Sequence, residues 1–192
     1  MEFLGFLKKY WNIVLVSAAG LATLLGNFAT APDFSADIPE GQINYYSFSR
    51  FLIAILFLIA LVPAYLFSKR KYLWTWWTLT VLTLGLSIWI HIRYNVFRDR
   101  KLLWNETIQR KMVIGDQLLP FADSLYRHSQ KTDNPLSYMQ LVDGLGGPER
   151  VWPDGERTEN AQKIILLYLS LVAAYSLCVI FGIQAMYCIT KK

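Results

Sequence analysis

The feature that most constrains this chain is an uninterrupted apolar segment close to its last residue. Residues 164–189 form a run of 26 residues without a charged side chain. As an α-helix this run would be about 39 Å long, whereas the hydrocarbon core of a bilayer is about 30 Å thick. The segment therefore predicts a transmembrane helix that tilts in the membrane or protrudes from it.

Three earlier segments have the same character. Residues 11–28 and 51–67 carry no charge, and residues 73–92 follow a basic turn and begin with an aromatic belt. Each is long enough to cross a bilayer, so we predict four transmembrane helices. The first segment also resembles a secretory signal peptide, with small residues before Pro32, but we expect it to be a retained helix.

The composition fits this interpretation. Hydrophobic residues make up 54% of the 192 residues and aromatic residues 15%, which exceeds what a soluble domain of this size buries. The formal charge of +5 is compatible with nucleic-acid binding, but membrane proteins are commonly basic because Lys and Arg collect at helix ends.

The fold class predicted is an all-α membrane protein with a small helical polar insertion between helices 3 and 4. This divides the chain into a three-helix transmembrane region (1–92), a polar insertion domain (93–163) and a fourth helix with a short basic tail (164–192). The insertion is charged throughout and too small for a substantial core of its own. We expect it to pack on the membrane helices or on copies of itself.

Two helices are predicted within the insertion. Residues 105–119 mix apolar and polar residues in an amphipathic pattern, which Pro120 should bend or end. Residues 135–145 follow the cap-like Asp133 and Asn134 and stop at a Gly-Gly-Pro sequence.

The orientation is set by competing charges. Both termini and the basic turn at 69–71 fall on one side of a four-helix topology, and the positive-inside rule makes that side cytoplasmic. The insertion would then lie outside, although it carries basic residues close to the membrane. If residues 11–28 do not span, the insertion becomes cytoplasmic, so both orientations stay open.

Enzymatic chemistry is not expected. The only histidines are His91 and His128, and neither has a nucleophile at a meaningful spacing. Cys178 and Cys188 lie ten residues apart in one apolar run, too far apart on a helix for a disulfide. The acidic residues of the insertion are spread singly, without the clustering that a metal site needs. We therefore expect no catalytic residue, metal or cofactor.

A basic cluster and a small-residue stripe are the candidate sites. The cluster is interleaved with aromatic residues, which can anchor a helix end among anionic lipid headgroups or hold single-stranded nucleic acid. The stripe recurs every fourth residue of the last span and serves either packing within the chain or an oligomer seam. The cluster comprises Arg93, Arg98, Arg100, Lys101, Arg110 and Lys111, and the stripe comprises Ser170, Ala174, Cys178 and Gly182.

Pore-lining polar residues are a weaker pattern. They would lie on one face of a span, although Ser and Thr also bond back to their own helix. The candidates are Thr75, Thr78, Ser87, Asn12, Asn27 and Gln184.

Several short phrases give the chain a resemblance to a known group of proteins. After a small-residue first helix come Tyr46-Ser47-Phe48-Ser49-Arg50-Phe51, a basic turn, Arg110-Lys111-Met112-Val113-Ile114-Gly115 and Glu149-Arg150-Val151-Trp152. In this order the sequence resembles the transmembrane effector modules of bacterial anti-phage defence systems, and it looks like the membrane channel subunit of the Hailong system. The resemblance covers most of the chain.

The resemblance implies a homo-oligomeric effector in the bacterial inner membrane that stays silent until infection and then depolarises the membrane, arresting the host. It also implies a regulatory nucleotidyltransferase whose oligonucleotide product restrains the channel and contacts the basic cluster. Such contacts would need a cytoplasmic insertion.

We therefore predict a multi-pass, gated membrane channel or membrane-disrupting effector, with membrane lipids and further copies of the chain as partners. The alternative is a non-conducting membrane subunit that anchors a soluble partner through residues 93–163. A transporter is disfavoured because no charged residue lies in the middle of a predicted span.

Overall fold

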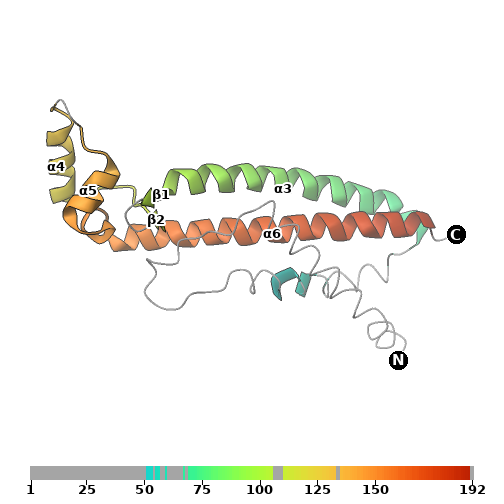
Figure 1. The fold of residues 1–192 in the computed structure, drawn as a ribbon. Coiled ribbons are helices and arrows are strands. Elements are labelled where there is room, and N and C mark those ends of the chain that lie inside the picture. The colour runs from blue at the N-terminus through green and yellow to red at the C-terminus, as the bar shows by residue number, and fades with distance from the viewer. Residues whose placement is uncertain are drawn as a thin grey trace. The chain divides into compact units, whose positions relative to one another are not determined.

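The computed structural model describes residues 51–53, 55, 56, 59, 67, 69–105, 110–132 and 135–190. The predicted first span, 11–28, and the polar stretch that follows it lie outside the described residues. Of the predicted second span, the described positions between Phe51 and Ile59 are helical. The chain is mostly helical, and its elements are drawn in Figure 1.

Contacts divide the chain into two compact units. We call the first the helix-pair unit; its described residues fall within 51–93 and 167–190. We call the second the polar unit; its described residues are 94–132 and 135–166. Each unit is described by itself below.

Two long helices dominate the helix-pair unit. A 3-10 turn, η1 (Arg70–Tyr72), leads into α3 (Leu73–Lys101), and the last helix is α6 (Asp154–Thr190). Both helices continue from one unit into the other. Within the helix-pair unit, Trp76 of α3 lies beside Phe181 of α6, and His91 lies beside Tyr175. Residue numbers thus rise along α3 as they fall along α6, so the pair is antiparallel.

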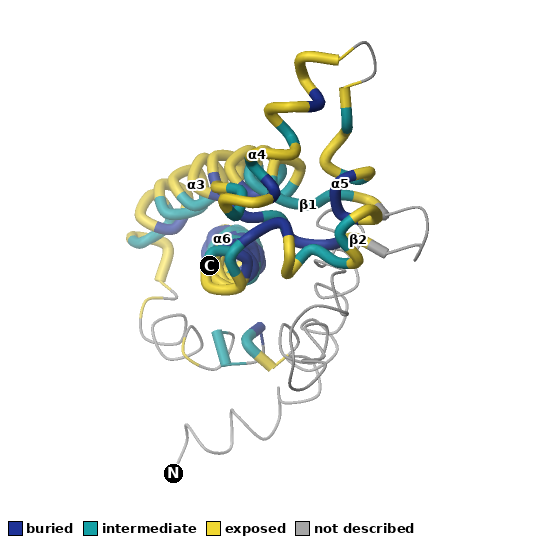
Figure 2. The backbone as a smooth tube through the Cα atoms, turned by 90° about the vertical axis from the view of Figure 1, so that its left-hand side faces the viewer, coloured by how far each residue is buried: buried dark blue, intermediate teal, exposed yellow. Residues whose placement is uncertain are grey.

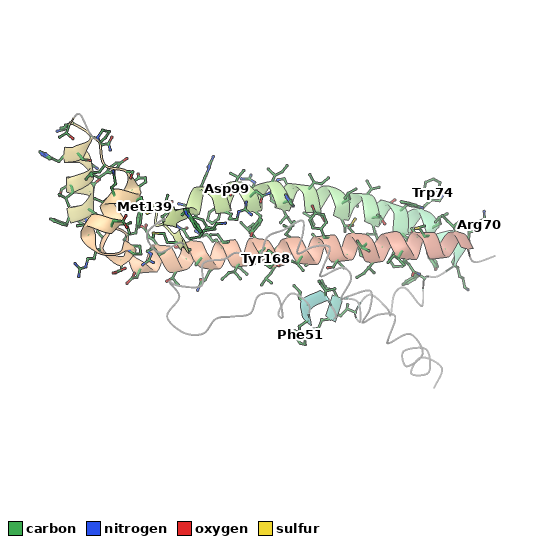
Figure 3. The ribbon with its side chains drawn as sticks, viewed as in Figure 1. Phe51, Arg70, Trp74, Asp99, Met139 and Tyr168 are labelled. Carbon is green, nitrogen blue, oxygen red and sulfur yellow. The ribbon has the colours of Figure 1, made fainter. Side chains whose placement is uncertain are left out.

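The two helices are buried to very different degrees. Ala185 and Cys188 of α6 are fully buried against Trp76. By contrast, α3 exposes large apolar side chains around much of its surface, including Trp74 at 80% exposure (Figure 3) and Leu82 at 64%. Figure 2 shows α3 as mostly exposed or intermediate and α6 with more buried residues along its length.

Two of the predicted spans correspond to helices long and apolar enough to cross a membrane. These are residues 70–101 and 154–186, judged by length and composition alone among the described residues. The predicted bounds of these spans mark the charge-free parts of the helices, not their ends. Helix α6 begins ten residues before residue 164, and α3 continues beyond residue 92 through Arg93 to Lys101.

The polar unit contains a two-stranded antiparallel ribbon, so the chain is not all-α. Strand β1 (Leu102–Asn105) pairs with β2 (Arg110–Val113), with Leu103 opposite Met112 and Trp104 opposite Lys111. The predicted helix over 105–119 is therefore wrong. Alternation decides the outcome, because Leu103 and Met112 pack into the core while Trp104 and Lys111 stay exposed.

Two short helices follow the ribbon. Pro120 does not end a helix but begins α4 (Pro120–Ser129), where its missing N–H is not needed. Helix α5 (Tyr138–Leu145) is the helix predicted over 135–145. It stops at Gly146, as predicted, in the left-handed conformation (φ +82°). It starts later than predicted because Ser137, not Asp133 or Asn134, is its N-cap, in a capping box with Gln140.

A compact apolar core holds these elements together. A 3-10 turn, η2 (Pro148–Arg150), brings Trp152 back against the ribbon and the two short helices. Trp152 is only 2% exposed. The polar unit thus has a hydrophobic cluster of its own, contrary to the expectation that so small an insertion would lack one; its buried members are Met112, Ala122, Leu141, Val142, Val151 and Trp152.

Candidate functional site

The six cations of the predicted basic cluster fall on different elements and have different partners. Arg93, in the helix-pair unit, lies over the Trp89 ring, with 5.5 Å between the guanidinium carbon and the ring centroid. Arg98, in the polar unit, lies over Tyr94 at 5.4 Å and pairs with Asp99 at 3.0 Å. In both cases a cation stacks on an aromatic residue four positions earlier on α3.

Of the remaining cations, one forms an ion pair and two have exposed side chains. Lys101 at the end of α3 forms an ion pair with Asp116. Arg100 is exposed at the same helix end, and Lys111 is exposed on β2 opposite Trp104. Arg110 begins β2, but its side chain lies outside the described part of the structure.

The pair of Lys101 and Asp116 has an electrostatic signature. The Lys101 ammonium, by its hydrogen bond, holds the pKa of the Asp116 carboxyl below its ordinary value of 3.8. Asn160 adds a weaker hydrogen bond to the other carboxylate oxygen, at 3.4 Å. Both contacts favour the charged carboxylate. Of the predicted nucleic-acid contacts, Lys101 is therefore already engaged by the protein itself.

Side chains in the first turns of α6 hydrogen-bond to the backbone at the end of β2 and in the loop after it. This arrangement was not predicted from the sequence. One Glu156 carboxylate oxygen accepts hydrogen bonds from the backbone N–H groups of Asp116 (2.8 Å) and Gln117 (3.0 Å). The Asn160 amide donates to the Ile114 carbonyl at 2.9 Å, and Arg157 Nε donates to the Val113 carbonyl at 3.3 Å. We call residues 156, 157 and 160 the α6 clamp.

The clamp was hard to foresee because its partners are about 40 residues apart in the sequence. The only local signal was three polar residues at i, i+1 and i+4 just ahead of an apolar run. Asn160 and Arg157 are nearly fully buried, at 2% and 8% exposure. Polar groups that deep are retained where their hydrogen bonds are satisfied.

The exposed apolar side chains of the polar unit are a second feature that the sequence analysis did not single out. On α4, Phe121 is 64% exposed and Leu125 36% exposed, one turn apart. Beside them Tyr126 stacks on Tyr138, with ring centroids 4.9 Å apart, and Tyr138 lies next to Trp152. Partial burial raises the pKa of Tyr138 above its ordinary value of 10.0. An exposed apolar pair on a polar domain is a feature of binding surfaces.

The small-residue stripe on α6 meets α3 over half its length. Cys178 Sγ lies 3.7 Å from the Thr80 carbonyl oxygen, and a Cβ placed on Gly182 would lie 3.7 Å from Thr80 Cγ2. Ala174 is buried, whereas Ser170 is exposed. Cys178 and Gly182 therefore approach Thr80 of α3 within the chain, and the role of the stripe as an oligomer seam stays a prediction.

Two of the candidate pore-lining residues hydrogen-bond to carbonyls of their own helix. Thr78 donates to the Trp74 carbonyl at 2.9 Å and Ser87 donates to the Thr83 carbonyl at 2.7 Å, both within α3. Thr75 is exposed, and Gln184 is buried with a polar partner. Asn12 and Asn27 lie outside the described residues.

The two histidines lie on different elements, His91 on α3 in the helix-pair unit and His128 on α4 in the polar unit. The Tyr175 hydroxyl lies 3.3 Å from His91 Nδ1 between α3 and α6, while His128 is exposed on α4. Cys178 and Cys188 are both free thiols. Among the described residues no three His, Cys, Asp or Glu side chains gather as metal ligands would.

Comparison of the chain with protein-family models, with curated proteins and with solved structures found no match.

Proposed function

We propose that this protein is a membrane-anchored binding subunit, in which the helix pair lies in the bilayer and the polar unit binds a soluble protein. Membrane insertion is supported by the apolar side chains that α3 leaves uncovered. Large residues exposed in this way cost free energy in water, about 25 cal/mol for each Å² of apolar surface, but not in lipid. We further propose four spans, two of them the described helices.

The observation that carries the binding role is the polar unit itself. It has its own buried cluster, a clamped loop and an exposed apolar pair, Phe121 and Leu125, on α4. A folded domain that keeps two large apolar side chains on one helix face in water has a surface suited to a partner's apolar groove or helix. This corresponds to the anchoring alternative of the sequence analysis.

Site-specific photocrosslinking in cells tests this role. A photoreactive amino acid at position 121 or 125 should give one discrete adduct, whereas the same residue at Arg127, on another side of α4, should not. Discrete adducts at all three positions, or at none, would refute the α4 surface as a binding face. Resistance of the full-length protein to alkaline carbonate extraction tests the insertion separately.

A gated channel or membrane-disrupting effector of an anti-phage defence system is the second candidate. It is favoured by the resemblance and by the middle of α3, where no described atom outside the helix's own backbone lies within 4 Å of the place a Cβ on Gly85 would occupy and Leu82 and Trp89 are exposed around it. A helix from another copy could approach closely there. In this proposal the protein is a homo-oligomer in the bacterial inner membrane, restrained by a nucleotidyltransferase or its oligonucleotide product.

Ion flux from liposomes that contain the purified protein distinguishes the two functions. A channel or disruptive effector should release an entrapped ion, and release should fall when Gly85 is replaced by Leu if copies pack at that position. An anchor should leave the liposomes tight in both forms. A membrane-potential dye in cells that express the protein gives the same discrimination in vivo.

A further inference from the structure

A hollow opens beside the first two turns of α3, in the helix-pair unit. It encloses about 360 Å³ and is apolar on nearly all sides, a size within the range of about 300–1,000 Å³ that small-molecule sites occupy. The described residues that line it are Phe67, Tyr72, Thr75, Trp76 and Leu79. Three of these described residues are aromatic, which suits a flexible hydrocarbon better than a polar metabolite.

The walls of this hollow are held in place by specific contacts. The Phe67 carbonyl accepts a hydrogen bond from Trp76 Nε1 at 2.9 Å, and Cys188 Sγ of α6 lies 3.9 Å from the same oxygen. The Phe67 ring meets the Tyr72 ring edge to face, with centroids 5.0 Å apart. Trp76 is itself buried against Ala185 of α6. The hollow is thus built from fixed groups and not from one loose side chain.

Three cations lie directly beside the hollow. Lys69, Arg70 and Lys71 are exposed in the turn between Phe67 and α3, and Arg70 marks this helix end in Figure 3. The Lys71 ammonium lies 4.8 Å from the centroid of the Tyr72 ring, which also lines the hollow. The basic turn therefore borders the apolar pocket.

These cations have no acidic partner within the part of their unit that the structure describes. Residues 51–93 and 167–190 contain no Asp or Glu. In the polar unit several cations do form ion pairs with carboxylates, as Lys101 does with Asp116. A cluster of three positive charges that no described acidic residue of its unit neutralises attracts an external anion.

We propose that this hollow binds one acyl chain of an acidic phospholipid, whose phosphate is held by Lys69, Arg70 and Lys71. The aromatic walls take the methylene groups, and the guanidinium and ammonium groups donate charged hydrogen bonds to the phosphate oxygens. The proposal rests on the insertion of the helix pair in a membrane, because only there does an acyl chain meet Phe67 and Trp76.

Native mass spectrometry of the full-length protein in mild detergent tests the proposal. Phosphatidylglycerol and phosphatidylcholine with identical acyl chains are offered in equal amounts. The wild-type protein should prefer phosphatidylglycerol by about tenfold or more, since each cation near an anionic headgroup contributes roughly 1 kcal/mol. Replacing Lys69, Arg70 and Lys71 together by Gln should bring the ratio close to one.

A second pair of variants tests the pocket independently of charge. Thr75→Phe places a ring in the hollow and should reduce the binding of both lipids, by about fivefold or more if one acyl chain loses several buried methylene groups. Thr78→Phe adds the same ring on the same helix, outside the pocket, and should bind like wild type. Equal binding by the two variants would overturn the proposal, and so would a wild-type lipid ratio in the triple Gln protein.

Two further measurements distinguish a bound lipid from a bound free anion, and a failed lipid site from a failed membrane insertion. Glycerol phosphate at millimolar concentration should not displace phosphatidylglycerol; displacement would assign the turn to a free anion and reject the lipid site. Carbonate extraction of the cell membranes from which each protein is purified shows whether that protein is inserted in the membrane at all. A protein that resists extraction but lacks lipid preference refutes only the lipid site, whereas an extracted protein refutes the proposed insertion.

Discussion

Gly115 in the loop after β2 offers the sharpest test of the polar unit's packing. A Cβ at this position would lie 2.9 Å from both Trp152 Cβ and Trp152 Cδ1, and 3.0 Å from a Glu156 carboxylate oxygen. Trp152 is buried in the core, and Glu156 accepts hydrogen bonds from two backbone N–H groups. Moving either side chain away from the new Cβ would therefore cost free energy. We expect Gly115→Ala to destabilise the unit by about 1–3 kcal/mol, the usual cost of overpacking.

Gly144 gives a matched control of opposite sign. It lies in α5, and among the described residues no atom outside the helix's own backbone lies within 4 Å of the place a Cβ would occupy. Alanine there should stabilise the helix by up to about 1 kcal/mol, because glycine loses more backbone entropy on folding. The same chemical change therefore has opposite predicted effects at two positions of one domain.

The assay is thermal unfolding of the full-length protein in detergent, followed by near-ultraviolet circular dichroism and by hydrogen exchange of peptides from the polar unit. For a unit of this size each kcal/mol shifts the midpoint by roughly 4–8 °C. Gly115→Ala should lower the midpoint and expose the amides of residues 114–117 to exchange, while Gly144→Ala should not. Unfolding of Gly115→Ala at the wild-type temperature would refute the packing described for Trp152.

Three smaller predictions concern single contacts. Because Lys101 lowers the Asp116 pKa, this carboxylate adds stability above pH 3.8 that is lost as the pH falls through its folded pKa. Asp116→Asn should therefore weaken the loss of unfolding free energy at acidic pH, by less than about 1 kcal/mol because the Asp116 carboxylate is largely exposed. An unchanged dependence of the unfolding free energy on acidic pH contradicts this. Ser137→Ala removes the cap of α5 and should cost about 0.5–2 kcal/mol, seen as faster amide exchange confined to that helix; unaltered exchange would count against the cap. Gly182→Ala should be tolerated beside Thr80, whereas Gly182→Leu should lower the thermal stability in detergent by several degrees; equal melting of the two variants would show that the helices do not meet there.

The long helices were predictable because charge-free runs and helix length are local properties. The runs at 73–92 and 164–189 needed only hydropathy and length to be recognised. The charged turns that extend these helices beyond the charge-free runs could not be recognised from hydropathy. The first turns of α6, from Asp154, include Arg157 and Asn160, which hydrogen-bond to the end of β2 and the residue after it, and no sequence window contains both sides of those hydrogen bonds.

The ribbon was mispredicted for a related reason. Over a few residues, alternating and helical apolar patterns are hard to distinguish, and long-range pairing decides between them. Trp104 and Lys111 stay on the outer face only because Leu103 and Met112 face a core assembled from α4, α5 and Trp152. Ser137 shows the same limit on a smaller scale, since Asp133 and Asn134 were equally good caps by residue type alone.

The partners of the cations in the basic cluster could not be predicted from the sequence. Six cations within 19 residues look like one surface in the sequence. In the structure Arg93 and Arg98 stack on aromatic rings, and Lys101 is taken by Asp116. Whether a side chain is committed to a neighbour or open to a ligand depends on its partners, which composition does not specify.

The charges at the two ends of α3 have an electrical consequence. Lys69, Arg70 and Lys71 precede the charge-free part of this helix, and Arg93, Arg98, Arg100 and Lys101 follow it together with Asp99. Three net positive charges therefore lie at either end. In the proposed membrane setting each charge is worth about 2.3 kcal/mol per 100 mV, so the contributions of the two ends cancel and the membrane voltage gives α3 by itself no preferred orientation. The sidedness of this helix would then be set by the rest of the chain and not by the cell's energetic state.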